Sequence, residues 1–407
     1  MDRRTVLQAA ALVPALGTSL LSARAKAQEN KPVRIGVLTD MGGQLTDIGG
    51  KGAIEAVRMA AEDFGRTVLS RPIEVVSADH QNKADIGSQI ATRWFDTDGV
   101  EMITDLLNSA VALGVQEVGR RKEKVTIVSG AGASDLTNAP CSPTGVHWTY
   151  DTYSLAAGIV RSMVAEGGDT WFFITLDYAF GTALEKDATR FITEAGGKVL
   201  GVVRHPQNTA DFSSYLLQAQ ASGAKVIALA NSGTDLINCI KQGAEFGIAR
   251  GGQKLAGMLI FLTDVHSLGL EVCQGLVLTQ PFYWDQTDGT RAFSRRFMDR
   301  VGRMPTSVQA GDYGATMHWL RAVQAAGTVA SGPVMAKMRE MPINDFMTRD
   351  GRLREDGRVL RPTYLFEVKS PAQSNGPWDF YTQRAEVPAA QATRPAAESD
   401  CPLLKRT

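Results

Sequence analysis

The chain has 407 residues, more than one compact hydrophobic core usually holds, and this length suggests two domains. Its composition is that of an ordinary globular protein, with 44% hydrophobic and 21% charged residues. Lysine plus arginine and aspartate plus glutamate both number 43, so the chain lacks the cationic excess that indicates binding to nucleic acid or to an anionic membrane.

The first 27 residues have the pattern of an export signal. Arg3 and Arg4 precede the apolar stretch "TVLQAAALVPALGTSLLSA", and an Ala-x-Ala pattern follows at 25–27. The paired arginines resemble a twin-arginine signal, although Asp2 stands where Ser or Thr is usual, so the export route stays open. A disordered cytoplasmic tail is the alternative. We expect a mature protein that begins near Gln28 and is periplasmic, with no other apolar run long enough to span a bilayer.

From Val33 onward, short apolar runs alternate with amphipathic stretches such as 50–64 and 210–222. Strands are predicted for "VRIGVLTD", "IEVVSAD", "EMITDLL" and "VTIVS", and then for "TWFFITLD", "KVLGVVR", "KVIALA", "MLIFLTD" and "GLVLTQ". This rhythm predicts an α/β fold in which helices cover both faces of parallel sheets.

An internal repeat divides the chain into two similar lobes. "VVSADHQNKADIGSQI" at 75–90 is matched by "VVRHPQNTADFSSYL" at 202–216, and "MITDLLNSAVA" at 102–112 by "VIALANSGTD" at 226–235. The first strand of each half ends in an aspartate, Asp40 or Asp177. The order is the same in both halves, which predicts lobes that start near residues 33 and 169.

Strand-to-helix loops meet at the carboxyl edge of a parallel sheet, where small ligands bind. Two facing lobes therefore predict a cleft lined by residues 39–43, 108–109, 129–134, 177–181, 231–234 and 263–265. Asn108 and Ser109 carry polar groups that suit a small ligand, or they cap a helix. Asp40, Asp177 and Asp264 would accept hydrogen bonds from a ligand ammonium group, or act as caps and turn residues.

Aromatic residues gather in the segments that would flank the cleft. An apolar wall with a few polar groups is typical of a small-molecule site, and the alternative is packing between the lobes. The residues are Trp148, Tyr150, Tyr153, Tyr178, Phe180, Phe282, Tyr283 and Trp284.

Signatures of catalysis are absent from the sequence. "GGKG" at 49–52 is not a phosphate-binding loop, no G-x-S-x-G motif occurs, and the five histidines never have metal-ligand spacing. We therefore expect no catalytic residues, no metal and no cofactor.

Four cysteines remain for an oxidising compartment. Cys141 and Cys401 both have loop surroundings, and we expect a disulfide between them that ties down the Pro/Ala-rich tail at 385–400. Cys239 and Cys273 are expected as buried thiols.

An ordered set of segments carries a family resemblance. "VRIGVLTDMGG", "DLLNSAVALGVQEVGRRKEKVTIVSGAGASDLT", "DYAFGTALEKDATRFITEAGGKVLG" and "VQAGDYGATMHWLRAV" resemble the periplasmic leucine/isoleucine/valine-binding proteins, which are type I solute receptors of ABC importers. The resemblance covers about residues 32–382. It implies two doubly wound parallel-sheet lobes joined by a three-segment hinge, with crossings near Thr149, Gln280 and Gly332. The implied lobes are 32–149 plus 281–332 and 150–280 plus 333–382, followed by a tail at 383–407.

The resemblance also implies a binding site. The family's serine-rich loop falls on 108–110, and its carboxylate- and ammonium-binding loop on 130–133. Its closing tyrosine falls on Phe180, and its acidic ammonium partner most nearly on Asp264. Only one serine remains, Gly132 replaces a threonine and Phe180 lacks a hydroxyl, so a branched-chain amino acid is not assured. The candidate ligand-binding residues are Asn108, Ser109, Ala131, Gly132, Ala133, Tyr150, Asp177, Tyr178, Phe180, Asn231 and Asp264.

The function that the resemblance implies is that of a monomeric periplasmic receptor for an importer. Its ligand would be a small carboxylate-bearing molecule: a branched-chain or related amino acid, or an aromatic acid or amide. The lobes would close on the ligand, and a membrane permease would receive it. An exported sensor for a membrane signalling receptor is the alternative, followed by an exported enzyme.

Overall fold

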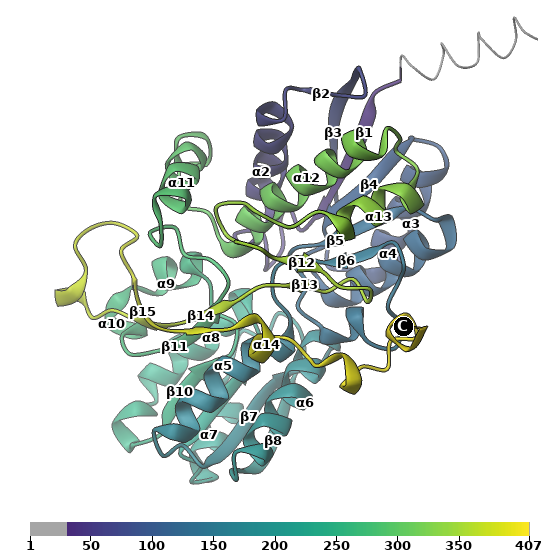
Figure 1. The fold of residues 1–407 in the computed structure, drawn as a ribbon. Coiled ribbons are helices and arrows are strands. Elements are labelled where there is room, and N and C mark those ends of the chain that lie inside the picture. The colour runs from purple at the N-terminus through teal and green to yellow at the C-terminus, as the bar shows by residue number, and fades with distance from the viewer. Residues whose placement is uncertain (1–30, 407) are drawn as a thin grey trace, which may run out of the picture.

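The computed structural model describes residues 31–406, which form two α/β lobes one above the other (Figure 1). The predicted export signal at 1–27 lies outside this part of the chain. None of the helices within 31–406 combines the length and the hydropathy that crossing a bilayer needs.

The first lobe is built on a six-stranded sheet with the order β2-β3-β1-β4-β5-β6. All neighbours are parallel except the short β2–β3 hairpin. The strands are β1 (Val33–Thr39), β2 (Thr67–Val68), β3 (Arg71–Asp79), β4 (Val100–Asp105), β5 (Val125–Val128) and β6 (Gly145–His147). Its helices are α2 (Gly50–Asp63), α3 (Ala84–Asp96), α4 (Ser109–Lys122), α11 (Asp288–Val301), α12 (Ser307–Ala326) and α13 (Ser331–Glu340).

The second lobe holds a four-stranded parallel sheet with the order β10-β9-β7-β8. The strands are β7 (Thr170–Leu176), β8 (Lys198–His205), β9 (Val226–Ala230) and β10 (Lys254–Gly257). The helices are α5 (Thr152–Ala165), α6 (Ala179–Glu194), α7 (Ser213–Ala221), α8 (Gly233–Glu245), α9 (Leu262–Leu268) and α10 (Leu270–Cys273). Short 3-10 turns lie in both lobes and the tail, at Ser134–Thr137, Ala249–Gly251, Pro371–Gln373, Ala396–Glu398 and Leu404–Arg406.

One predicted strand is wrong. The run at 258–264 follows β10 instead of forming a strand, because Asp264 turns the chain into α9. Its carboxylate accepts a hydrogen bond from the Phe261 N–H at 2.8 Å. An apolar run beside a helix start cannot be told from a buried strand by its hydropathy alone.

Antiparallel strands complete the fold, three beside the second lobe and one pair on the first. β11 (Val277–Gln280), β14 (Thr363–Val368) and β15 (Tyr381–Val387) form a three-stranded sheet, and β12 (Arg352–Leu353) pairs with β13 (Val359–Leu360). "GLVLTQ" is thus a strand, but its partner β14 runs antiparallel to it.

The third passage between the lobes lies later than the predicted position near Gly332. Val334, Met335 and Val359 pack in one core cluster with Val33 and Ile35, so the chain up to β13 stays with the first lobe. It joins the second-lobe core only with β14. The assignment of all of 333–382 to the second lobe is therefore wrong, because amphipathic α13 covers the first lobe's core and not the second's.

The C-terminal segment runs across both lobes and ends on the first (Figure 1). After β15, which extends past the predicted tail boundary at 383, α14 (Ala389–Ala392) packs on α5. Arg394 then pairs with Asp187 of α6 at 2.9 Å, and Glu398 pairs with Arg190 of the same helix at 2.6 Å.

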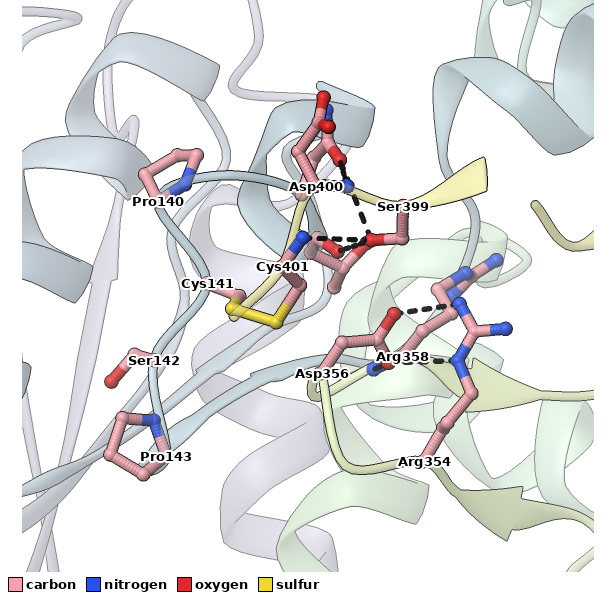
Figure 2. The surroundings of a disulfide bond; sticks show 12 residues. Pro140, Cys141, Ser142, Pro143, Arg354, Asp356, Arg358, Ser399, Asp400 and Cys401 are labelled. Atoms are coloured by element: carbon pink, nitrogen blue, oxygen red, sulfur yellow. Dashed lines mark hydrogen bonds and ion pairs between the residues drawn. A yellow bond between two sulfur atoms is a disulfide. The ribbon is translucent and has the colours of Figure 1, made fainter. Parts of the chain in front are cut away.

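A disulfide anchors this segment, as expected from the two loop cysteines. Cys141 and Cys401 are bonded with their Cα atoms 5.7 Å apart (Figure 2). The Asp400 N–H donates to Asn138 Oδ1 at 2.6 Å beside the bond. Cys239 and Cys273 are buried free thiols, as expected.

Candidate ligand-binding cleft

The carboxyl ends of the two parallel sheets face each other across a nearly filled cleft. A cavity of about 20 Å³ remains, which is room for about one water molecule. The first lobe and the segment after β6 contribute Gln44, Leu45, Ile48, Leu107, Asn108, Ser109, Gly130, Gly132 and Tyr150 to its lining. The second lobe contributes Leu176, Tyr178, Phe180, Ser232, Leu259 and Phe261.

The two lobes touch directly at the cavity. The Ser109 N–H donates a hydrogen bond to Tyr178 Oη at 2.8 Å, which joins the start of α4 to the start of α6. Thr234 Oγ1 donates to the Gln44 carbonyl oxygen at 3.4 Å. A Cβ added at Gly132 would lie 2.9 Å from Phe180 Cε2, so this glycine allows the ring to reach the first lobe. The cleft is therefore closed.

The start of α4 shows why the polar pair after β4 is placed here. Asn108 is the N-cap residue, and its Oδ1 accepts hydrogen bonds from the N–H groups of Ala110 and Val111 at 3.0 and 3.1 Å. Ser109 Oγ accepts from the Ala133 N–H at 3.2 Å and holds the small-residue loop. Capping, the alternative interpretation of Asn108, is therefore correct, although the residue also lines the cavity.

Two phenols bring hydroxyl groups into this apolar site. Tyr150 Oη donates to the Gly130 carbonyl oxygen at 2.6 Å. Burial raises the pKa of Tyr150 well above its usual range and that of Tyr178 to about 12, because an ionised ring would lose its hydration. Both side chains are therefore neutral hydrogen-bonding groups at any physiological pH.

The acidic candidates do not line the cavity. Asp40 holds its own turn, accepting hydrogen bonds from the N–H groups of Gly43 and Leu45 at 2.6 and 3.0 Å. Asp177 is exposed. Asp264 is buried in the first turn of α9, where its carboxylate accepts from the N–H of the N-cap residue Phe261, and burial raises its pKa to about 7. The structure thus favours the cap and turn interpretation for Asp40 and Asp264.

Six of the eleven candidate residues lie on the cavity: Asn108, Ser109, Gly132, Tyr150, Tyr178 and Phe180. Ala131 and Ala133 are buried behind the loop surface, and the Asn231 amide faces His205 Nε2 at 3.1 Å. Its neighbour Ser232 lines the cavity instead. Of the aromatic candidates, Phe282 and Tyr283 lie in core clusters, which is the packing alternative.

Sequence reasoning missed most of the apolar wall, because a leucine in a loop has no chemical signature. The missed lining residues are Gln44, Leu45, Ile48, Leu107, Leu176, Leu259 and Phe261, whereas Gly130 and Ser232 lie in the cleft loops predicted at 129–134 and 231–234. Gln44, Leu45 and Ile48 follow the first predicted strand, Leu107 and Leu176 lie at the ends of predicted strands, and Leu259 and Phe261 lie in the run at 258–264 that was predicted as a strand. Proximity to a strand end is the signal that was available for the first five.

A buried carboxyl pair beneath the cleft was also missed. Asp105 and Asp312 are both fully buried, and Asp312 Oδ1 accepts a hydrogen bond from Thr104 Oγ1 at 3.2 Å. Burial, with a smaller contribution from the charge of Asp40, raises the pKa of Asp105 to about 7. Burial, followed by the charge of Asp105, raises the pKa of Asp312 well above its ordinary value. Asp105 lies behind Gly49 and Gly130, where added Cβ atoms would come within 2.9 and 3.0 Å of its carboxyl oxygens.

Within residues 31–406 no three His, Cys, Asp or Glu side chains are grouped closely enough to hold a metal ion.

Comparison with known proteins is consistent with this geometry. A family model described as "Periplasmic binding protein" matches residues 32–376. A solved periplasmic binding protein from Burkholderia mallei is 48% identical, with a TM-score of 0.90, over 92% of this chain and 99% of that one. A branched chain amino acid ABC transporter periplasmic ligand-binding protein from Burkholderia xenovorans is 41% identical, with a TM-score of 0.83, over 91% of this chain and 100% of that one.

A curated relative is more distant. Leu/Ile/Val-binding protein homolog 6 of Brucella melitensis is 24% identical over 255 residues, which are 62% of this chain. The chain spans 65% of the length of that relative, just under two thirds.

Proposed function

This chain belongs to the periplasmic binding protein family, and we propose that it captures a small carboxylate-bearing ligand between its lobes and delivers it to an ABC importer. The ligand would be a branched-chain or related amino acid, an aromatic acid or an amide. We propose a periplasmic location, a monomer that works with a membrane permease, and a binding role without catalysis.

One observation carries the proposal: both lobes contribute to one cavity, and they meet there through the Ser109–Tyr178 hydrogen bond. A ligand that contacts both lobes stabilises the closed state, whereas a ligand that contacts only one lobe does not change the equilibrium. Closure would thus report ligand capture to the importer.

A thermal-shift screen of the purified chain against amino acids, aromatic acids and amides tests the proposal. Binding to the folded state adds about 2.7 kcal/mol when the ligand concentration is 100 times Kd, which moves the melting temperature upward. If no small molecule raised the melting temperature at millimolar concentration, the proposal would be wrong.

Two phenylalanines of α6 provide a matched pair of variants. Phe180 lines the cavity, whereas Phe191 packs on Tyr153 with ring centroids 4.9 Å apart. We expect Phe180→Ala to lose the ligand-dependent shift. We expect Phe191→Ala to lower the melting temperature but to keep that shift. The opposite pattern would mean that Phe180 is a core residue and not part of the site.

A further inference from the structure

The cavity lining offers no carboxylate partner for a ligand ammonium group. All fifteen of the described residues that line it are uncharged. A cationic amino group taken out of water needs a carboxylate partner, because an unpaired buried charge is strongly unfavourable. The carboxyl of Asp105 is fully buried behind Gly49 and Gly130 and does not belong to the lining.

The same cavity is surrounded by helix N-termini. Ile48 lies just before α2, Ser109 begins α4, Tyr178 precedes α6 and Ser232 precedes α8, and each of these helices has at least 13 residues. The first turns of α2, α4 and α6 contain no acidic residue. The N-cap residues Gly49, Tyr178 and Ser232 make no side-chain cap bond, although Thr39 Oγ1 accepts from the first N–H of α2, that of Gly50, at 2.9 Å. Such ends attract negative charge.

One of these donors already holds an oxygen atom. The Ser109 N–H binds Tyr178 Oη at 2.8 Å, while Asn108 takes the next two N–H groups of α4. A ligand oxygen that replaced the phenol would find this N–H directed at it. Gln44 also lines the cavity, and its buried amide oxygen has no partner in the protein; a 180° turn of that amide would present its N–H groups instead.

From this arrangement we infer that the ligand is a small monocarboxylate without a cationic amino group, a conclusion that rests on the proposed function. Because the cleft described here has room for only about one water molecule, the ligand needs the lobes slightly further apart. Its carboxylate then replaces Tyr178 Oη as the acceptor of the Ser109 N–H. Its hydrocarbon part packs on the apolar wall of Leu45, Ile48, Leu107, Phe180 and Phe261. Zwitterionic amino acids are excluded because their ammonium group would be buried unpaired.

Calorimetry of the purified chain with matched ligands tests this inference. The sets are leucine, 4-methylpentanoate and 3-methylbutylamine; phenylalanine, 3-phenylpropanoate and 2-phenylethylamine; and benzoate with benzamide. We expect at least one carboxylate to bind tenfold or more tightly than its amino acid, with no measurable binding of the amines or of benzamide.

Other calorimetric results would overturn either the inference or the proposed function. Tighter binding of leucine or phenylalanine than of the deaminated analogue would overturn the inference but leave the receptor function intact. Equal binding of benzamide and benzoate would also overturn it. If neither these ligands nor any from the wider screen bound, the proposed function itself would fail.

Removal of the Ser109 backbone N–H by substitution with proline tests where the ligand carboxylate binds. Ser109 is the first residue of α4, where proline is well tolerated, and the extended backbone of Asn108 (φ −101°, ψ 129°) suits a residue before proline. Ser109→Pro removes the N–H and the hydroxyl, whereas Ser109→Ala removes only the hydroxyl. We expect the proline variant to bind the carboxylate at least tenfold more weakly than the alanine variant. Equal affinity of two folded variants, checked by circular dichroism, would place the carboxylate elsewhere and overturn the inference.

Discussion

Removal of the Cys141–Cys401 disulfide should cost this protein a large part of its stability. The bond closes a loop with a sequence separation of 260 residues, so it restricts the unfolded chain strongly. The chain-entropy model gives about 5.6 kcal/mol at 25 °C for a loop of this length. Noncovalent contacts of the tail, such as the Arg394–Asp187 ion pair, exist only in the folded state. They therefore cannot replace the restriction that the disulfide places on the unfolded chain.

Urea unfolding followed by tryptophan fluorescence measures the effect. We expect Cys141→Ser/Cys401→Ser to lower the free energy of unfolding by about 2–5 kcal/mol, the usual range for a native disulfide. Dithiothreitol should destabilise the natural protein to a similar degree and leave the double variant unchanged. A loss below about 1 kcal/mol would refute the reasoning, because it would mean that the unfolded chain gains little freedom without the bond.

Three further results are expected. Gly132→Ala should weaken ligand binding at least tenfold in calorimetry, with little change in the unliganded melting temperature, because the new Cβ would lie 2.9 Å from Phe180 Cε2 in the closed cleft. The pKa of Asp105 rises to about 7 on folding, so the folded protein keeps this carboxyl protonated between about pH 4 and pH 7 while the unfolded chain loses the proton. The free energy of unfolding should therefore fall as pH increases from about 4 to about 7. The fall in the urea midpoint over this range should be smaller for Asp105→Asn than for the natural protein. Arg358→Leu should lower the free energy of unfolding by about 3–5 kcal/mol in urea, because it leaves Asp151, its buried partner at 2.9 Å, unpaired.

The lobes could be predicted because parallel strands read as continuous apolar runs between amphipathic helices. The repeat then fixed which strand ends face the cleft. Local hydropathy did not predict the structure where two different kinds of element have the same hydropathy pattern. The run at 258–264 is apolar enough for a buried strand, but it forms a loop and the first turn of α9. The amphipathic pattern of α13 does not say which lobe it covers, and it covers the first.

The site was only partly predictable, because a side chain's position relative to its loop decides whether it reaches the cavity. Asp177 and Tyr178 are adjacent, yet the acid is exposed and the phenol crosses to Ser109. Asp264 follows Phe261 closely, but it turns back to cap the Phe261 N–H while the ring lines the cavity. Capping and ligand binding use the same residue types, so sequence alone could not separate these roles.

Hinge closure on a ligand is the central claim, and small-angle X-ray scattering tests it most directly. The radius of gyration would be measured for the chain alone and with a saturating amount of a ligand found by calorimetry. We predict that the ligand reduces the radius of gyration and brings the scattering curve to that of the closed arrangement described here. A ligand that binds tightly and leaves the scattering curve of an open protein unchanged would contradict the account.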